Sequence, residues 1–261
     1  MLSKKELQDY AKLKGLNLGN AEKDYLIDIA LLSISRNTKN ELVFKGGTCL
    51  YKFHRLGRFS EDLDFSAVYK INIDNLISHM LSDFEKFGVR AFMHKKEEPY
   101  NSILITLRLE GPLFSGKPMT YASIGVDINL KSSVDLEPEF LEYNSSYPDI
   151  PKISVLCMRR EEIFAEKIRA LMTRARARDL FDLDFLLKKN VYSKKEIIDK
   201  KMEYYKKELS TSKIIQKIKS LDKSWEKELS GFTSETPSFQ KTSKEVIEYL
   251  KKHYNKREYC K

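Results

Sequence analysis

The sequence predicts an α+β fold, in which a core with a mixed β-sheet and packed helices is followed by a helical domain. Three observations lead to this prediction. The first half of the chain alternates helical and strand-like hydrophobic patterns. Segment 136–152 has three prolines and little periodicity, which is typical of a boundary. The patterns after it have the helical period, so we expect a core over residues 1–150 and a helical domain over residues 151–261.

The elements of the core follow from their local patterns. Ser3 and Glu6 form a capping-box pattern, which starts a helix that ends near Gly15. The helical pattern over residues 20–35 is apolar enough to be buried. The other elements expected in the core are a strand at 42–44, a helix at 48–54, a strand at 62–65, an amphipathic helix at 74–87 and strands at 89–94, 102–109 and 123–130.

The second domain contains two clear amphipathic helices, residues 161–172 and 178–187, joined by a basic turn at 174–178. Beyond Lys188 the chain carries Lys-Lys pairs interleaved with apolar residues. Such pairs are typical of the solvated side of a helix, and we prefer this interpretation to a dedicated RNA-binding stripe.

Composition limits the class of protein. The chain of 261 residues is 41% hydrophobic, which is enough for a core, and its net charge of +9 favours a polyanionic partner such as nucleic acid. A surface rich in lysine for other reasons is the alternative. The three cysteines have no metal-like spacing. Cys49 and Cys157 are expected to be small buried side chains, and Cys260 lies in a tail. This cysteine usage fits the reducing cytoplasm. No apolar run approaches the ~20 residues that span a membrane, so we expect no membrane partner.

A Gly-Gly-Thr turn stands ahead of an Asp-x-Asp pair. Gly46 and Gly47 lie where a strand leads into a helix, so their backbone amides can approach a phosphate. Asp62 and Asp64 alternate in a strand and point to one face. Two adjacent carboxylates repel each other unless a divalent cation joins them, and Mg²⁺ is the ion expected with nucleotide phosphates. The pattern therefore predicts nucleotidyl transfer.

A third carboxylate is expected at Asp127. It interrupts an apolar strand in phase with Gly125, and a buried Asp in a sheet is costly unless it is paired, hydrogen-bonded or bound to metal. Glu61 and Asp135 are weaker candidates, because Glu61 has the opposite strand parity to the pair and Asp135 lies past the end of the strand.

Several of these motifs together resemble a known family. The run Lys45-Gly46-Gly47-Thr48, then Leu50, then Arg58-Phe59-Ser60-Glu61-Asp62-Leu63-Asp64-Phe65 is similar to the signature of the AbiEii/AbiGii toxin family, a branch of the DNA polymerase beta superfamily of nucleotidyltransferases. The similarity extends to segment 166–171 and to the Arg-Asp-x-x-Asp element at 178–182. It covers roughly residues 20 to 190, and we find no resemblance beyond them.

The resemblance implies a polymerase-beta-like core, whose cleft is completed by the helical domain, and adds site residues. Lys167 would face the nucleotide phosphates, with Asp179 and Asp182 near the same cleft. From the residues alone, Lys167 is a snorkelling side chain at the border of a buried face, and the two aspartates form a helix cap or ion pairs. The nucleotide-binding set is completed by the residues of the turn and the segment before the aspartates, namely Lys45, Gly46, Gly47, Thr48, Arg58 and Ser60.

These features predict a metal-dependent transfer of NMP from an NTP to a hydroxyl, with Mg²⁺ or Mn²⁺ bound by Asp62, Asp64 and Asp127. The family implies a toxin that acts on RNA, with the 3′ end of tRNA as acceptor and a separate antitoxin protein as partner. Two alternatives stay open. A metal-dependent nuclease would also need clustered acids and a lysine but does not explain the Gly-Gly-Thr turn, and a non-catalytic nucleotide- or RNA-binding module would not need all three carboxylates.

Overall fold

The computed structural model describes residues 1–254, so the predicted tail cysteine Cys260 lies outside the described residues. The chain forms two compact units, the first from Met1 to Met158 and the second from Arg159 onward. No helix among the described residues is long and apolar enough to cross a membrane.

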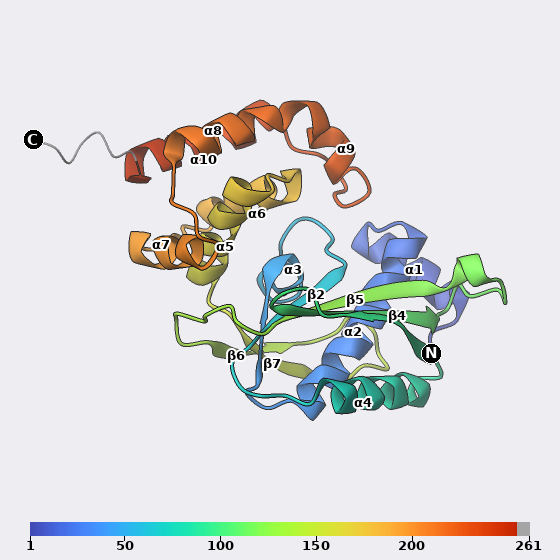
Figure 1. Ribbon diagram of the computed structural model, residues 1–261. Helices are drawn as coiled ribbons and strands as arrows, with labels where there is room; N and C mark the ends of the chain where they lie inside the picture. The colour runs from blue at the N-terminus through green and yellow to red at the C-terminus, as the bar shows by residue number, and fades with distance from the viewer. Residues whose placement is uncertain (255–261) are drawn as a thin grey trace, which may run out of the picture. The chain divides into compact units, whose positions relative to one another are not determined.

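The first unit is built on a seven-stranded mixed sheet with the order β3-β4-β5-β2-β1-β7-β6, which confirms the predicted fold class (Figure 1). The β1–β7 and β2–β5 pairs are parallel and the other neighbours are antiparallel. The strands are β1 (Leu42–Lys45), β2 (Asp62–Ala67), β3 (Arg90–Glu97), β4 (Ser102–Glu110), β5 (Ala122–Asn129), β6 (Glu139–Tyr143) and β7 (Ile153–Cys157).

Helices cover one face of this sheet and leave much of the other open. The helices of the unit are α1 (Lys4–Lys14), α2 (Leu18–Asn37), α3 (Gly46–His54) and α4 (Ile73–Lys86), with a 3₁₀ turn at Pro118–Thr120. Figure 1 shows α2 and α4 below the strands, where they pack against the sheet and each other. In β4 the side chains alternate accordingly: Ile103, Ile105 and Leu107 are buried against the helices, while Thr106 and Arg108 are half-exposed. The burial of each Ile or Leu stabilises the fold by roughly 1.5–3 kcal/mol.

The second unit is entirely helical apart from one isolated bridge within residues 159–254. Its helices are α5 (Arg160–Thr173), α6 (Ala177–Lys188), α7 (Lys195–Tyr204), α8 (Thr211–Ser220), α9 (Trp225–Leu229) and α10 (Phe239–Tyr254), with a 3₁₀ turn at Asp222–Ser224. Helix α5 packs against α6, α7 and α8, and α10 packs against α6 and α8. Trp225 is buried and donates from Nε1 to the Pro237 carbonyl oxygen at 2.7 Å.

Most expected elements are present within a few residues of their predicted bounds. The capping box of Ser3 and Glu6 is formed, and Gly15 adopts the left-handed conformation that ends α1. Cys49 and Cys157 are buried free thiols, as predicted. Strands β6 and β7 are not predicted by the sequence pattern, because their five-residue runs lie in or just after the proline-containing segment, which has the pattern of a boundary. The first unit therefore continues past residue 150 to include β7.

Candidate active site

Three aspartates lie on the open face of the sheet. The parallel register of β2 and β5 places Asp64 beside Asp127 and Asp62 beside Gly125. Residues in register on adjacent strands share a face, and Asp62 and Asp64 share theirs because they are two residues apart. Asp62 is exposed, whereas Asp64 and Asp127 are half-buried. The strand parity predicted for these three residues is therefore observed. Glu61 lies outside this row and forms an ion pair with Lys23.

Strand β1 continues the row and leads into α3. Lys45, the last residue of β1, is in register with Asp64, so a lysine and two aspartates lie on three neighbouring strands. Gly46 follows with a φ of 74°, and the start of α3 has no side-chain cap. Backbone N–H groups at a helix start carry partial positive charge and bind anions. The turn expected to bind phosphate thus begins beside the carboxylates.

Close neighbours require glycine at both positions of this turn. A Cβ at Gly46 would overlap the carboxylate of Asp64, and the positive φ also disfavours a side chain. A Cβ at Gly47 would lie 2.6 Å from Arg58 Nη2 and 2.8 Å from Ser60 Oγ. The two glycines therefore allow a carboxylate and a buried guanidinium to approach the first turn of α3.

The segment between α3 and β2 is held by buried polar contacts. Arg58, only 3% exposed, donates from Nη1 to the Phe59 carbonyl oxygen at 3.0 Å. The fully buried hydroxyl of Thr48 donates to the Asp62 carbonyl oxygen at 2.5 Å and lies 3.0 Å from Ser60 Oγ. The Thr48 side chain therefore fixes the start of β2, so a contact between Thr48 and phosphate, which stays a prediction, would use its backbone N–H.

Asp62, Asp64 and Asp127 supply the oxygen ligands that Mg²⁺ and Mn²⁺ prefer. Within residues 1–254, no group of three or more His, Cys, Asp or Glu side chains is arranged to hold a metal ion. The three aspartates are therefore candidate ligands by their chemistry and by their register on β2 and β5, and not by the present arrangement of their side chains. Joint ligation by all three stays a prediction.

An ionic cluster that the sequence analysis missed fastens α3 to α2. Lys52, one turn after Thr48, is fully buried, and its Nζ lies 2.6 Å from both Asp24 Oδ1 and Asp28 Oδ1. The other oxygen of Asp24 lies 2.6 Å from Lys14 Nζ. The available signal was that Asp24 and Asp28 stand four residues apart in an otherwise apolar helix, and so share one face.

Burial and charge act in opposite directions on these groups. Burial raises the pKa of Asp24, but the charges of Lys52 and Lys14 outweigh it and hold this pKa at about 2. For Asp28 burial dominates over the attraction of Lys52, and its pKa is raised. Burial lowers the pKa of Lys52, yet the two carboxylates overcome this and raise it well above its ordinary value. The lysine is therefore charged and α3 is held by an ionic contact.

The second unit has its own ionic cluster, formed by α5 and α6. Lys167 Nζ lies 3.1 Å from Asp179 Oδ1 and 2.6 Å from Asp182 Oδ2, and all three side chains are buried. Arg174 donates from Nε and Nη2 to the two oxygens of Asp179, both at 2.9 Å. Although burial raises the pKa of Asp179, the adjacent Lys167 and Arg174 lower it below its usual range. Lys167 is thus a buried ion-pair partner and not the snorkelling side chain that its helical pattern favoured.

The predicted basic turn separates into three arginines with different contacts. Arg174 is engaged with Asp179, and the guanidinium of Arg178 lies 5.0 Å from the centre of the Phe232 ring. Arg176 is exposed. Of the Lys-Lys pairs expected to be solvated, Lys201 is an exception, because it is buried and pairs with Glu162 at 2.5 Å.

Comparisons with known proteins identify the family and the fold. A family model described as the nucleotidyl transferase AbiEii toxin of a type IV toxin–antitoxin system matches residues 30–250. The fold is similar to that of MenT4, a nucleotidyltransferase toxin from Mycobacterium tuberculosis H37Rv, with a TM-score of 0.66 and 17% identity over 96% of this chain and 90% of the other. It is also similar to JHP933 from Helicobacter pylori, with a TM-score of 0.55 and 18% identity over 91% and 95%. A comparison with curated protein sequences gives no match.

Proposed function

The chain belongs to the AbiEii family of nucleotidyltransferase toxins of type IV toxin–antitoxin systems. On this premise we propose that it transfers NMP from an NTP to an RNA acceptor, the 3′ end of a tRNA. The observation that carries the proposal is the row of Lys45, Asp64 and Asp127 on three adjacent strands, beside the uncapped start of α3. Carboxylates next to a helix start suit a triphosphate that binds with divalent cations. The net charge of +9 suits an RNA acceptor.

In the proposed reaction the acceptor hydroxyl oxygen forms a bond to the α-phosphorus of the NTP. The bond from this phosphorus to the oxygen that bridges to the β-phosphate breaks, and pyrophosphate leaves. Asp127 orients the hydroxyl and receives its proton. Asp62, Asp64 and Asp127 would hold Mg²⁺ or Mn²⁺, which when bound neutralises charge that develops on the phosphates.

The remaining site residues position the nucleotide. The amides of Gly46, Gly47 and Thr48 bind its phosphates, and Lys45 and Arg58 supply positive charge. Ser60 and the Thr48 hydroxyl hold the chain that precedes Asp62. In the helical unit, we assign to Lys167 a charge that acts on the triphosphate and to Asp182, at 2.6 Å, the orientation of this lysine.

A toxin of a type IV system implies an antitoxin. We propose that a separate protein fills this role and that the transferase alone is sufficient for catalysis. Purified protein, without any partner, is therefore the appropriate sample for the assay below.

The experiment is incubation of the protein with each labelled NTP and total tRNA, in the presence of Mg²⁺ or Mn²⁺. We expect labelled tRNA lengthened at its 3′ end, and no product from Asp64→Asn. Shortened RNA would instead show a nuclease, and a mobility shift without product would show a binding module. Either result would overturn the proposal.

Metal binding is tested separately from turnover. Titration with Mn²⁺, followed by electron paramagnetic resonance of the free ion, should show binding to the wild type that is lost in Asp64→Asn. Glu61→Gln removes one negative charge from the residue just before β2 and serves as the matched control, because Glu61 pairs with Lys23 and lies outside the row. Equal loss in both variants would indicate an effect of net charge and not of ligation.

A further inference from the structure

The open face of the sheet continues from the carboxylates to the edge strand β3. In β3, β4 and β5, the residues Phe92, Arg108 and Ser123 are in register and form one row across the strands. Ser123 shares the face of Asp127 because the two residues are four positions apart along β5. At ~3.3 Å per residue this row lies about 13 Å from Asp127. A further row between the two contains Lys95 and Thr106.

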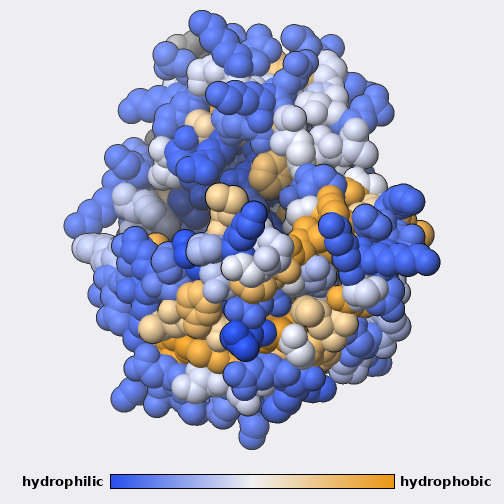
Figure 2. Space-filling model, turned by 90° about the vertical axis from the view of Figure 1, so that its right-hand side faces the viewer, coloured by the Kyte–Doolittle hydropathy of each residue, from blue (hydrophilic) through white to orange (hydrophobic). Residues whose placement is uncertain are grey.

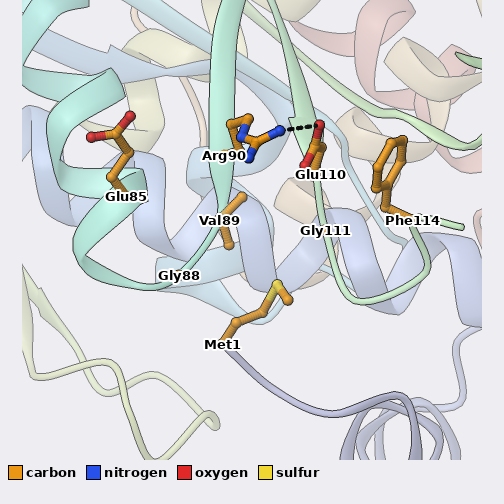
Figure 3. Close-up of a pocket in the computed structure, with 8 residues that line it drawn as sticks. All are labelled: Met1, Glu85, Gly88, Val89, Arg90, Glu110, Gly111 and Phe114. Atoms are coloured by element: carbon orange, nitrogen blue, oxygen red, sulfur yellow. Dashed lines mark hydrogen bonds and ion pairs between the residues drawn. The ribbon is translucent and has the colours of Figure 1, made fainter. Parts of the chain in front are cut away.

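Arg108 is a cation of this face with no ion pair among residues 1–254. Arg90, nearer the strand end, pairs with Glu110 at 3.4 Å, as Figure 3 shows, and Lys95 pairs with Glu97 at 2.9 Å. Arg108 is half-exposed, and within residues 1–254 its guanidinium makes no ion pair. A half-exposed arginine between open strands is suited to a phosphate that comes from outside the chain.

Aromatic rings lie next to this arginine. Phe92 is 37% exposed and meets Tyr121 edge-to-face, with ring centroids 5.3 Å apart, and Tyr121 stacks on Phe114 at 4.7 Å. Phe114 in turn borders a cavity of about 390 Å³ at the end of β3 and β4 (Figure 3). Figure 2 shows the right-hand side of Figure 1, toward which the β4–β5 loop projects. This face carries apolar surface among hydrophilic side chains. The ring of Phe92 is exposed, those of Tyr121 and Phe114 are half-buried, and the three hold one another in place.

We propose that Phe92, Lys95, Thr106, Arg108, Tyr121 and Ser123, which we call the acceptor track, bind the single-stranded RNA that precedes the reacting 3′ hydroxyl. This inference rests on the proposed function, because it assumes an RNA acceptor. Arg108 binds a phosphate of the RNA backbone and Phe92 stacks on a base, the two contacts from which sequence-tolerant binding of single strands is built. At ~3.4 Å per stacked nucleotide, 13 Å corresponds to about four nucleotides from the 3′ end.

Steady-state kinetics with an RNA acceptor tests the track. We expect Arg108→Gln and Phe92→Leu each to raise KM for RNA by about tenfold, the effect of one lost phosphate contact or one lost stacked base. The KM for NTP and kcat at saturating RNA should be unchanged, because neither residue lies at the carboxylates. Arg108→Gln alone should also reduce the salt slope of RNA binding by about one.

Two substitutions of the same kind serve as controls. Arg36→Gln removes an exposed arginine at the end of α2, and Phe140→Leu alters a 60% exposed ring on β6, the opposite edge of the sheet. Both should leave KM for RNA unchanged. If the wild type extends RNA and the track variants keep its KM, the track is refuted and the proposed function stands. If the wild type extends no RNA at all, both are refuted.

Cross-linking provides a second test that does not depend on the stability of a variant. An RNA with 4-thiouridine about four nucleotides from its 3′ end should cross-link in the wild type to the peptides that contain Phe92 or Tyr121. Cross-links confined to other segments, such as the lysine-rich helices after Lys188, would overturn the proposal.

Discussion

Lys52→Met should destabilise the first unit by an amount that depends on pH. The methionine keeps the apolar length of the side chain but removes the charge between Asp24 and Asp28. Asp24 retains Lys14 at 2.6 Å, whereas Asp28 retains, among residues 1–254, the hydroxyl groups of Tyr143 at 3.2 Å and Ser145 at 2.7 Å. Removal of one partner of a buried ion pair costs about 3–5 kcal/mol. The variant can avoid a buried charge by protonating Asp28. With an ordinary pKa of 3.8, this protonation costs about 4 kcal/mol at pH 7, which is therefore the upper limit of the destabilisation.

The sign of the pH dependence follows from the same group. Burial already raises the pKa of Asp28, and loss of Lys52, which lowers this pKa, raises it further. The folded variant therefore holds a proton that the unfolded chain releases, so its stability is fully present below pH 3.8 and is lost as pH rises towards the folded pKa. The deficit relative to the wild type should therefore grow between pH 5.5 and 7.5, by at most about 2.7 kcal/mol, because one proton contributes about 1.4 kcal/mol per pH unit.

Chemical denaturation of both proteins at these two pH values, followed by far-ultraviolet circular dichroism, measures the deficit. Trp225, the single tryptophan, lies in the second unit, so its fluorescence gives an internal control whose transition should change little. The double variant Lys52→Met/Asp28→Asn removes the uncompensated carboxylate and should recover most of the loss at pH 7.5. An equal deficit at pH 5.5 and 7.5, or no recovery in the double variant, would refute the assigned role of Asp28.

Three further predictions concern the site. Lys167→Met should abolish transfer and lower the melting temperature, because it leaves Asp182 uncompensated at a cost of about 3–5 kcal/mol. Lys201→Met, which also breaks a buried ion pair, should lower the melting temperature alone, and equal turnover of both variants below their melting transitions would contradict the role of Lys167. Gly47→Ala should destabilise the chain by about 1–3 kcal/mol by steric overlap with Arg58 and raise KM for NTP, which denaturation and kinetics would show. Arg176→Gln should reduce the slope of log affinity for tRNA against log salt concentration by about one, because this exposed arginine is expected to contact a phosphate. An unchanged slope would show that the RNA does not contact Arg176.

The sequence predicted what depends on local pattern. Strand periodicity alone placed Asp62 and Asp64 on one face, and an acidic residue in an apolar run singled out Asp127. The register that sets Asp127 beside Asp64 is a property of strand order, because β2 pairs with β5 across two intervening strands of the chain. Periodicity carries no information on this pairing, so the pattern gave the candidates but not their contact.

Buried charges were harder to predict because their partners are remote in the chain. Lys52 meets Asp24 from 28 residues away, and Tyr147 donates to the same carboxylate from 123 residues away. In sequence, a lysine in an amphipathic helix is typical of a solvated or snorkelling side chain. Lys167 and Lys201 show the same difference between pattern and structure. Their helical patterns are typical of solvated or snorkelling lysines, yet both pair with buried carboxylates.

The contacts of α3 imply that its phosphate-binding turn is preformed. Thr48 and Lys52 lie one turn apart, so they share a face of α3, yet the first is bound to the start of β2 and the second to α2. The turn at Gly46 therefore cannot shift without breaking a buried hydrogen bond or a buried ion pair, which each cost more than a typical surface contact. If the turn is preformed, Lys52→Met should raise KM for NTP under conditions where the variant is folded, because the ligand must then order the helix start on binding. An unchanged KM would show that Thr48 and the packing of α3 suffice to hold the turn.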